Sequence, residues 1–317
     1  MFKIKVPATT ANMGAGFDCV GMALNLYNEL EVQESDRFLI EFKSQAPDPA
    51  MLLTTEDNLI YQVITRFYDE VGKKLPKLKL TQNDTIPMTR GLGSSSACIV
   101  SGLFAANALC GKPLTRDELA QMACQIEGHP DNVAPAVYGG LIVAVLEGEE
   151  HKEGPDSFMS SRRLHHVKIS PSDELSFVTF VPDFQLSTAK ARRILPQDYS
   201  KADVIFNISR ASLFVASMMC GNWDNLPVSV NDRIHQPYRG TLIPNMDKIF
   251  EHAHNEGAKG IFMSGAGPTL IAITLRKNEK AFAKKMKAHL AKLENSWETK
   301  ILHADLDGAT VQYCSTN

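Results

Sequence analysis

A glycine-rich segment that ends in three serines, PMTRGLGSSSA, occupies residues 87–97. Gly91 and Gly93 allow the backbone to approach a ligand closely. The segment leads into an apolar stretch typical of a buried helix, whose free N–H groups and dipole would favour a polyphosphate. The lysine of the G-x-x-x-x-G-K-[ST] loop is missing. Its charge would have to come from Arg90 or from a magnesium ion held by a serine hydroxyl and a carboxylate. A tight strand-to-helix turn with a serine cap is the structural alternative.

A second polar segment, EGHPDNVAPAVYGG, follows at residues 127–140. It places a carboxylate, a histidine, a second carboxylate and an amide within six residues. A glycine and a proline end the preceding helix here, and such loops often carry function. We expect Glu127 to bind metal and the rest of the segment to face substrate. In the alternative, the segment is a polar turn in which Asp131 and Asn132 cap the next helix.

Two further glycine-bearing segments lie near the ends of the chain. In VPATTANMGAGFDCVGMALNL (residues 6–26), Asn12 and Asp18 bracket two glycines. This segment is either a ligand loop or a simple hairpin. The other segment, SGAGPT (residues 264–269), interrupts an apolar strand-like stretch. Glycines in such a place indicate a turn or the close approach of another backbone.

Two arginine-bearing segments complete the set of candidates. They are LSTAKARRILP at residues 186–196 and RIHQPYRG at residues 233–240. A planar guanidinium is a natural partner for a carboxylate and often binds it through two hydrogen bonds. Ordinary surface arginines are the alternative.

Local signals predict the elements that must position these segments. Apolar spacing predicts a helix over residues 58–71. Thr115 and Glu118 form the pattern of a capping box for a helix that runs to Ile126. The other elements expected in the first half are strands at residues 4–8, 39–42, 78–80 and 140–147, the last buried on both faces, and a helix at 97–109.

The polar stretch EGEEHKEGPDSFMSS is the best candidate for a linker or a long hairpin. We therefore expect a domain boundary near residue 155, which gives domains 1–155 and 156–317. The pattern after it suggests an α+β sandwich. Its expected elements are strands at residues 164–169 and 177–182, helices at 201–219 and 246–256, a strand around a glycine turn at 260–275, and a charged helix at 279–294.

The length, composition and net charge of the chain favour a soluble globular protein. The 317 residues suffice for two ordinary domains, and 44% hydrophobic with 22% charged residues is typical of soluble globular proteins. With a net charge of −3, the chain as a whole does not attract nucleic acid or an anionic membrane electrostatically. The six cysteines form no C-x-x-C pair, and the chain shows neither an apolar signal region nor an apolar run of membrane-spanning length. We expect a cytoplasmic protein with free thiols.

Together, and in this order, the segments resemble the GHMP kinase superfamily. PMTRGLGSSSA is similar to its P-x-x-x-G-L-G-S-S-A loop, and SGAGPT is similar to its C-terminal glycine motif. Within the superfamily, VPATTANMGAGFDCVGMAL and EGHPDNVAPAVYGG resemble the homoserine kinases, and STAKAR and HQPYR match that family as well. The resemblance covers nearly the whole chain.

The resemblance implies an α+β, two-domain GHMP kinase fold. The N-terminal domain would be ribosomal-protein-S5-domain-2-like, and the C-terminal domain would be a ferredoxin-like sandwich. The implied reaction transfers the γ-phosphoryl group of ATP, with Mg²⁺, to the side-chain hydroxyl of L-homoserine in threonine biosynthesis. A homodimer is implied too.

The resemblance also assigns residue roles. Residues expected near ATP are Asn58, Pro87, Arg90, Gly91, Leu92, Gly93, Ser94, Ser95, Ser96, Ala97, Gly265 and Gly267. Residues expected to hold Mg²⁺ are Glu127 and Ser95, or Ser94 in its place. Residues expected around homoserine are Asn12, Asp18, His129, Asp131, Arg192 (or Arg193) and Arg239, with the arginines at its carboxylate and Asp18 at its ammonium group. Residues expected to act in catalysis are Asn132, Thr188 and Arg192, with Asn132 and Thr188 near the γ-phosphate and the attacking hydroxyl.

The sequence also departs from the pattern of the family. Arg90 stands where many relatives have a small residue, and the segment from Glu127 to His129 is shorter than in some of them. Another kinase of the superfamily, such as a mevalonate kinase, is one alternative, although those enzymes tend to carry an aspartate base where this chain has Asn132. A non-catalytic ligand sensor is the other alternative, and it would be expected to lose Ser95, Glu127 or the glycines.

Overall fold

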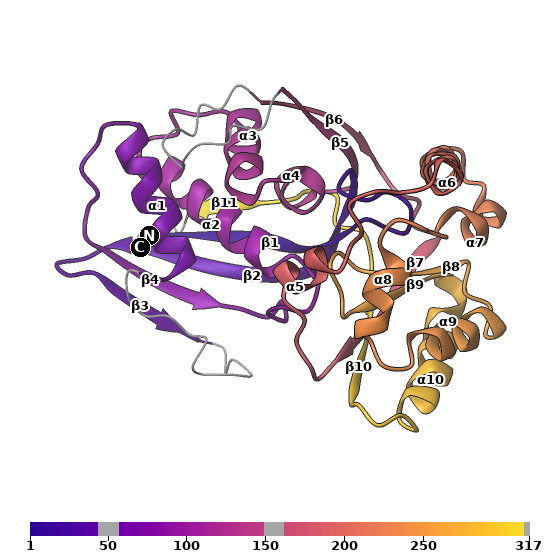
Figure 1. The fold of residues 1–317 in the computed structure, drawn as a ribbon. Coiled ribbons are helices and arrows are strands. Elements are labelled where there is room, and N and C mark those ends of the chain that lie inside the picture. Colours follow the sequence, from indigo (N-terminus) through magenta and orange to yellow (C-terminus); the bar gives the residue numbers. More distant parts are fainter. Residues whose placement is uncertain (44–56, 149–161, 314–317) are drawn as a thin grey trace.

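The computed structural model describes residues 1–43, 57–148 and 162–313. Its larger sheet has seven strands, in the order β11-β1-β2-β4-β3, with β5 joined to β2 and β6 joined to β5 (Figure 1). All neighbours are antiparallel except β3 and β4. The strands are β1 (Phe2–Ala11), β2 (Val20–Glu34), β3 (Leu39–Phe42), β4 (Leu78–Asn83), β5 (Leu141–Glu147), β6 (Arg163–Ile169) and β11 (Thr310–Tyr313).

Four helices pack with this sheet, and α2 is central among them. Almost all of α2 is apolar and buried, because it contacts β1 on one side and both α1 and α3 on the other. The expected buried helix is thus confirmed. The capping box is also confirmed, since Thr115 and Glu118 exchange their hydrogen bonds at the start of α3. The helices are α1 (Leu59–Glu70), α2 (Ser94–Leu109), α3 (Arg116–Glu127) and α4 (Pro130–Tyr138).

The smaller sheet is antiparallel, in the order β10-β7-β9-β8. Successive side chains of a strand point to opposite faces. Phe177 and Ile273 join the large core shared with the first sheet, whereas Val178 and Ala272 pack into a separate core with α9 and α10. The strands are β7 (Leu175–Pro182), β8 (Gly260–Met263), β9 (Leu270–Leu275) and β10 (Trp297–Leu302), and the helices of this half are α5 (Thr188–Arg193), α6 (Lys201–Cys220), α7 (Leu226–Ser229), α8 (Gln236–Arg239), α9 (Met246–Asn255) and α10 (Glu279–Leu290).

The pairing of strands differs from a division of the chain at residue 155. β6 pairs along its length with β5, and β11 pairs with β1, so both strands belong to the first sheet although both follow that residue. The polar stretch therefore joins two neighbouring strands, as the hairpin alternative expected; residues 149–161 themselves lie outside the described residues. The pairing of β11 depends on contacts across nearly the whole chain, which local sequence signals do not encode.

Three local expectations were wrong in extent. α2 begins at Ser94 rather than at residue 97, because Gly93 takes a left-handed conformation that sets the start of the helix. β5 is not buried on both faces, since Val145 near its outer end is 55% exposed. α10 ends at Leu290, and residues 291–294 form a turn and a bend.

Among the described residues, one helix, α6, is long and apolar enough to cross a membrane by length and composition alone. α6 contacts α7, and Phe214 and Met218 on one side of it are part of the large core. It carries a capping bond at its first turn, from the backbone of Asp203 to Ser200. These contacts are those of a helix packed on a folded domain.

Candidate active site

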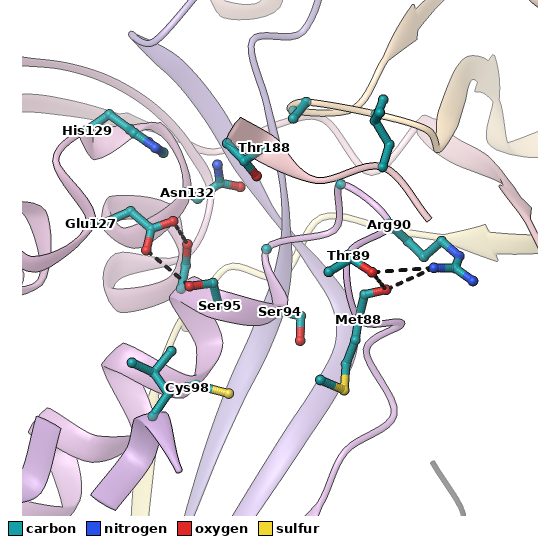
Figure 2. Close-up of a pocket in the computed structure, with 18 of the residues that line it drawn as sticks. Met88, Thr89, Arg90, Ser94, Ser95, Cys98, Glu127, His129, Asn132 and Thr188 are labelled. Atoms are coloured by element: carbon teal, nitrogen blue, oxygen red, sulfur yellow. Dashed lines mark hydrogen bonds between the residues drawn. The ribbon is translucent and has the colours of Figure 1, made fainter. Parts of the chain in front are cut away.

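A cavity of about 320 Å³ lies where the two halves of the chain meet. The first half contributes the glycine loop, the start of α2 and the loop between α3 and α4. The second half contributes α5, α8 and the turn between β8 and β9. The segments singled out in the sequence therefore come together around one cavity, part of which Figure 2 shows.

The glycine loop has a shape that side chains would prevent. Gly91 and Gly93 have φ angles of 76° and 70°, which lie in the left-handed region. A Cβ atom at Gly91 would lie 2.4 Å from the carbonyl oxygen of Ser264, and one at Gly93 would lie 1.9 Å from Oγ1 of Thr9. The loop thus ends at the first turn of α2, whose unpaired N–H groups suit phosphate oxygens.

Glu127 and two serines of α2 form the oxygen-rich part of the site. Oγ of Ser95 lies 3.4 Å from Oε2 of Glu127, and Oγ of Ser96 lies 3.1 Å from Oε1. Figure 2 shows the Ser94 hydroxyl pointing away from this carboxylate. Burial raises the pKa of Glu127, although His129 and the two serine hydroxyls oppose the shift. A buried carboxylate with a hydroxyl beside it offers the oxygen ligands that Mg²⁺ prefers, so these residues fit the expected ion.

Another part of the cavity is lined by a pair of oppositely charged residues, Asp18 and Arg192. Arg192 donates two hydrogen bonds to the carboxylate of Asp18, at 2.9 Å and 3.0 Å. The planar guanidinium matches the two carboxylate oxygens. Both residues line the cavity, whereas the neighbouring Arg193 is exposed and does not contribute to the lining. Of the two arginines that the sequence left open, Arg192 is the one that faces the cavity.

His129 and Asp131 lie beside this pair. Nδ1 of His129 is 2.7 Å from Oδ1 of Asp131. Burial alone would lower the pKa of His129, but the hydrogen bond and the charges of Asp131 and Glu127 outweigh burial and raise it. One ligand atom each from Asp18, His129 and Asp131 lies within 4.8 Å of the others. Acidic and basic side chains therefore lie close together in this part of the cavity.

Asn12 and Arg239 line the cavity but also hold its walls together. The Asn12 amide donates to the carbonyl of Gly265 and accepts from the backbone N–H of Asp18. Asn12 and Asp18 both have positive φ angles, which are uncommon outside glycine. The buried Arg239 guanidinium donates to the carbonyls of Ala191 and Gly265. Both side chains fix the loops that present Asp18 and Arg192.

Asn132, from α4, and Thr188, from α5, both line the cavity (Figure 2). Oδ1 of Asn132 accepts a hydrogen bond of 2.8 Å from the buried hydroxyl of Thr9. This bond orients the amide, and its N–H group is left to donate. Thr188 is the first residue of α5, and Ser187 caps that helix through the backbone of Lys190.

Arg90 makes several hydrogen bonds to backbone carbonyls. Its guanidinium donates to the carbonyls of Met88, Pro182 and Asp183, and Figure 2 shows it directed away from Ser94 and Ser95. Arg90 therefore ties the glycine loop to the end of β7, and it also lines the cavity.

The remaining residues expected near ATP divide into two groups. Asn58 lines the cavity while its side chain caps α1, and Gly265 and Gly267 line it opposite the loop. Leu92 and Ala97 belong to the large core, and neither they nor Pro87 are among the described lining residues. Sequence reasoning missed the lining residues Phe42, Asp57, Gln82, Asp84 and Cys98.

The fold and the loop define a class of protein. Residues 58–140 match the family model of GHMP kinases N terminal domain, and residues 213–292 match that of GHMP kinases C terminal. The chain is thus a GHMP kinase with the two-domain α+β fold of that class.

Full-length relatives identify the family within this class. The chain is 44% identical over 313 residues to a homoserine kinase of Caldicellulosiruptor bescii, covering 98% of this chain and 97% of that one. It is 40% identical over 312 residues to a homoserine kinase of Clostridium botulinum, covering 98% of each. The chain belongs to the homoserine kinase family. The crystal structure of a homoserine kinase from Cytophaga hutchinsonii matches with a TM-score of 0.83 at 26% identity, covering 98% of this chain and 96% of that one.

Proposed function

We propose that this protein transfers the γ-phosphoryl group of ATP to the side-chain hydroxyl of L-homoserine, giving O-phospho-L-homoserine for threonine biosynthesis. One observation carries the proposal beyond family membership. The cavity is lined both by the glycine loop with the start of α2 and by the Asp18–Arg192 pair. A zwitterionic amino acid carries both a carboxylate and an ammonium group, so it can satisfy each member of that pair with an opposite charge.

The residues between these two sites suit in-line transfer. The orientation of the Asn132 amide by Thr9 leaves its N–H group to hold the acceptor hydroxyl. Thr188 lines the same cavity, near the expected position of the γ-phosphate. Phosphoryl transfer through a loose transition state depends mainly on positioning and charge neutralisation. An obligatory general base is therefore not needed.

Ser95 and Glu127 would hold Mg²⁺ in this proposal. The ion would supply positive charge beside the phosphate oxygens, in place of the absent loop lysine. Its binding would also offset the burial that raises the pKa of Glu127. Arg192, which lines the same cavity, adds a positive charge from the acceptor side.

The test compares phosphate acceptors in parallel. ADP release from ATP is measured with L-homoserine, mevalonate, galactose and shikimate at equal concentrations. Release should rise with L-homoserine alone, and mass spectrometry should find one added phosphoryl group on it. A rise with mevalonate or a sugar, and none with homoserine, would contradict the proposal.

We further propose a cytoplasmic homodimer that needs neither nucleic acid nor membrane. The net charge of −3 supports the independence from nucleic acid and membrane, whereas the homodimer rests on the resemblance to the homoserine kinases. Light scattering of the purified protein at several concentrations measures the mass, and a value near that of the 34.9 kDa monomer would contradict the dimer.

A further inference from the structure

A buried histidine from the second half of the chain contacts the loop that presents Asp18. His235 directly precedes α8, and its side chain is fully buried. Its Nε2 atom lies 2.8 Å from the carbonyl oxygen of Gly14, in the loop between β1 and β2. Burial lowers the pKa of His235, so the imidazole is neutral at pH 7. Because a carbonyl group only accepts hydrogen bonds, the single ring hydrogen lies on Nε2.

The loop between β1 and β2 needs contacts from outside itself. Asn12, Gly14 and Asp18 have φ angles of 68°, 85° and 56°, in the left-handed region. Residues other than glycine adopt that region at a cost, so the surrounding structure has to hold them there. Gly14 lies directly against the second half of the chain, since a Cβ atom on it would be 2.3 Å from the carbonyl oxygen of Val230. The hydrogen bond from His235 secures the loop at the same place.

The ring of His235 is linked to the two arginines of the site through Phe17. It stacks on the Phe17 ring with the centroids 5.2 Å apart and an angle of 27° between the planes. The guanidinium carbons of Arg239 and Arg192 lie 5.1 Å and 5.9 Å from the centre of the same Phe17 ring, which is within the range of a cation–π contact. Phe17 is not among the described lining residues of the cavity, so its ring supports the arginines from outside.

We propose that His235 is a positioning residue for the phosphate acceptor. Acting through Gly14 and Phe17, it fixes the charged pair that would hold the ammonium and carboxylate groups of L-homoserine. The inference rests on the proposed function, which makes L-homoserine the acceptor. His235 is itself absent from the described lining of the cavity, so it acts through its neighbours. A displaced pair binds the acceptor less well in the ground state and the transition state alike, which raises KM and leaves kcat unchanged.

Two substitutions separate the hydrogen bond of His235 from its ring. His235→Phe keeps an aromatic ring against Phe17 but removes the donor, whereas His235→Gln keeps a donor and removes the ring. His235→Phe should raise the KM for L-homoserine by about 3- to 10-fold, the range of one hydrogen bond, while kcat and the KM for ATP stay within about twofold of the wild type. His235→Gln should recover part of that loss, because its amide can donate to the carbonyl of Gly14.

Hydrogen exchange of the folded variants tests the loop without relying on activity. The backbone N–H groups of Gly16, Asp18 and Val20 are hydrogen-bonded within the loop, so their exchange reports how often it opens. In His235→Phe, residues 12–20 should exchange faster, whereas the glycine loop at residues 87–97 should keep its wild-type rate. The matched control is His303→Phe.

The control also removes a ring nitrogen from a histidine that follows the second sheet. Nε2 of His303 lies 2.9 Å from a carboxylate oxygen of Glu279, and His303 is not among the described lining residues of the cavity. His303→Phe should therefore change neither the exchange of residues 12–20 nor either KM.

A loss of stability alone gives a different result from a displaced loop. Fewer folded molecules would lower kcat and the melting temperature but leave both KM values unchanged. That result would overturn the inference, and so would wild-type exchange of residues 12–20 in His235→Phe or a His235→Gln variant whose KM matches that of His235→Phe. If His235→Phe does not fold, Phe17→Leu takes its place, since loss of the ring beneath the arginines should raise the KM for L-homoserine alone. If the proposed function fails, the wild type does not phosphorylate L-homoserine either, and hydrogen exchange still decides whether His235 holds the loop.

Discussion

Replacement of Asn132 by alanine tests whether the enzyme needs a general base. The amide is fixed by the hydroxyl of Thr9 and lines the cavity together with Thr188. If Asn132 only positions the acceptor hydroxyl, its loss removes one hydrogen bond from the transition state and strands one partner. The lost hydrogen bond costs about 0.5–1.5 kcal/mol and the stranded hydroxyl of the acceptor about as much again, so kcat should fall by about 10- to 100-fold. A true general base would contribute about 10²–10⁴-fold.

The same substitution should also lower stability, because the Thr9 hydroxyl is fully buried and loses its acceptor. A stranded buried donor costs about 1–3 kcal/mol. Thr9→Val separates the two effects. It removes the hydroxyl that orients the amide, but it keeps Asn132 in place. We expect Thr9→Val to lower kcat less than Asn132→Ala does.

The assay is the pH profile of kcat for the wild type and the variants, with ADP release as the readout. The shape of the profile should not change in Asn132→Ala. The carboxylates that could act as a base are Asp18 and Asp131, and each already accepts hydrogen bonds, from Arg192 and His129 respectively. The reasoning is refuted if Asp18→Asn or Asp131→Asn alone lowers kcat by more than about 10³-fold and removes an acid limb.

Three more predictions concern the charged residues of the site. Glu127→Gln should raise the magnesium concentration needed for half-maximal activity and lower kcat, and a wild-type titration curve would exclude Glu127 as a ligand. Arg192→Ala should raise the KM for homoserine by at least about tenfold with little change for ATP. The exposed neighbour provides the control, since Arg193→Ala should change neither value. Because the pKa of His129 is raised in the folded protein, its pairing with Asp131 stabilises the fold fully below about pH 6.5 and is lost as the pH rises through the folded-state pKa. Asp131→Asn should therefore flatten the fall in unfolding free energy as the pH rises above about 6.5, and denaturant melts that show the wild-type slope would contradict this pairing.

The parts of the fold that the sequence predicted are those with local causes. The capping box at Thr115 is complete within four residues, and the stripe of Val63 and Phe67 reflects the period of a single helix. The arrangement of strands has no local cause. β11 joins the first sheet by pairing with β1 at the other end of the chain, and β6 joins it by pairing with β5 across the expected boundary, so that boundary and the observed sheets differ.

In the site, likewise, the sequence predicted the residues with recognisable side-chain chemistry but not the contacts made to the backbone. Glu127, His129 and Asp131 were expected because their side chains carry recognisable chemistry. The role of Arg90 was not, since its partners are the carbonyls of Pro182 and Asp183, and every residue has a carbonyl.

Backbone contacts of this kind recur wherever the two halves meet at the loop. The hydroxyl of Ser264 donates to the carbonyl of Gly91, and the backbone of Thr269 donates to that of Arg90. The second domain thus sets the position of the phosphate loop as well as carrying Thr188 and Arg192. A change in the packing of the two halves would therefore move the phosphate site and the acceptor site together, although each site alone is formed by short segments.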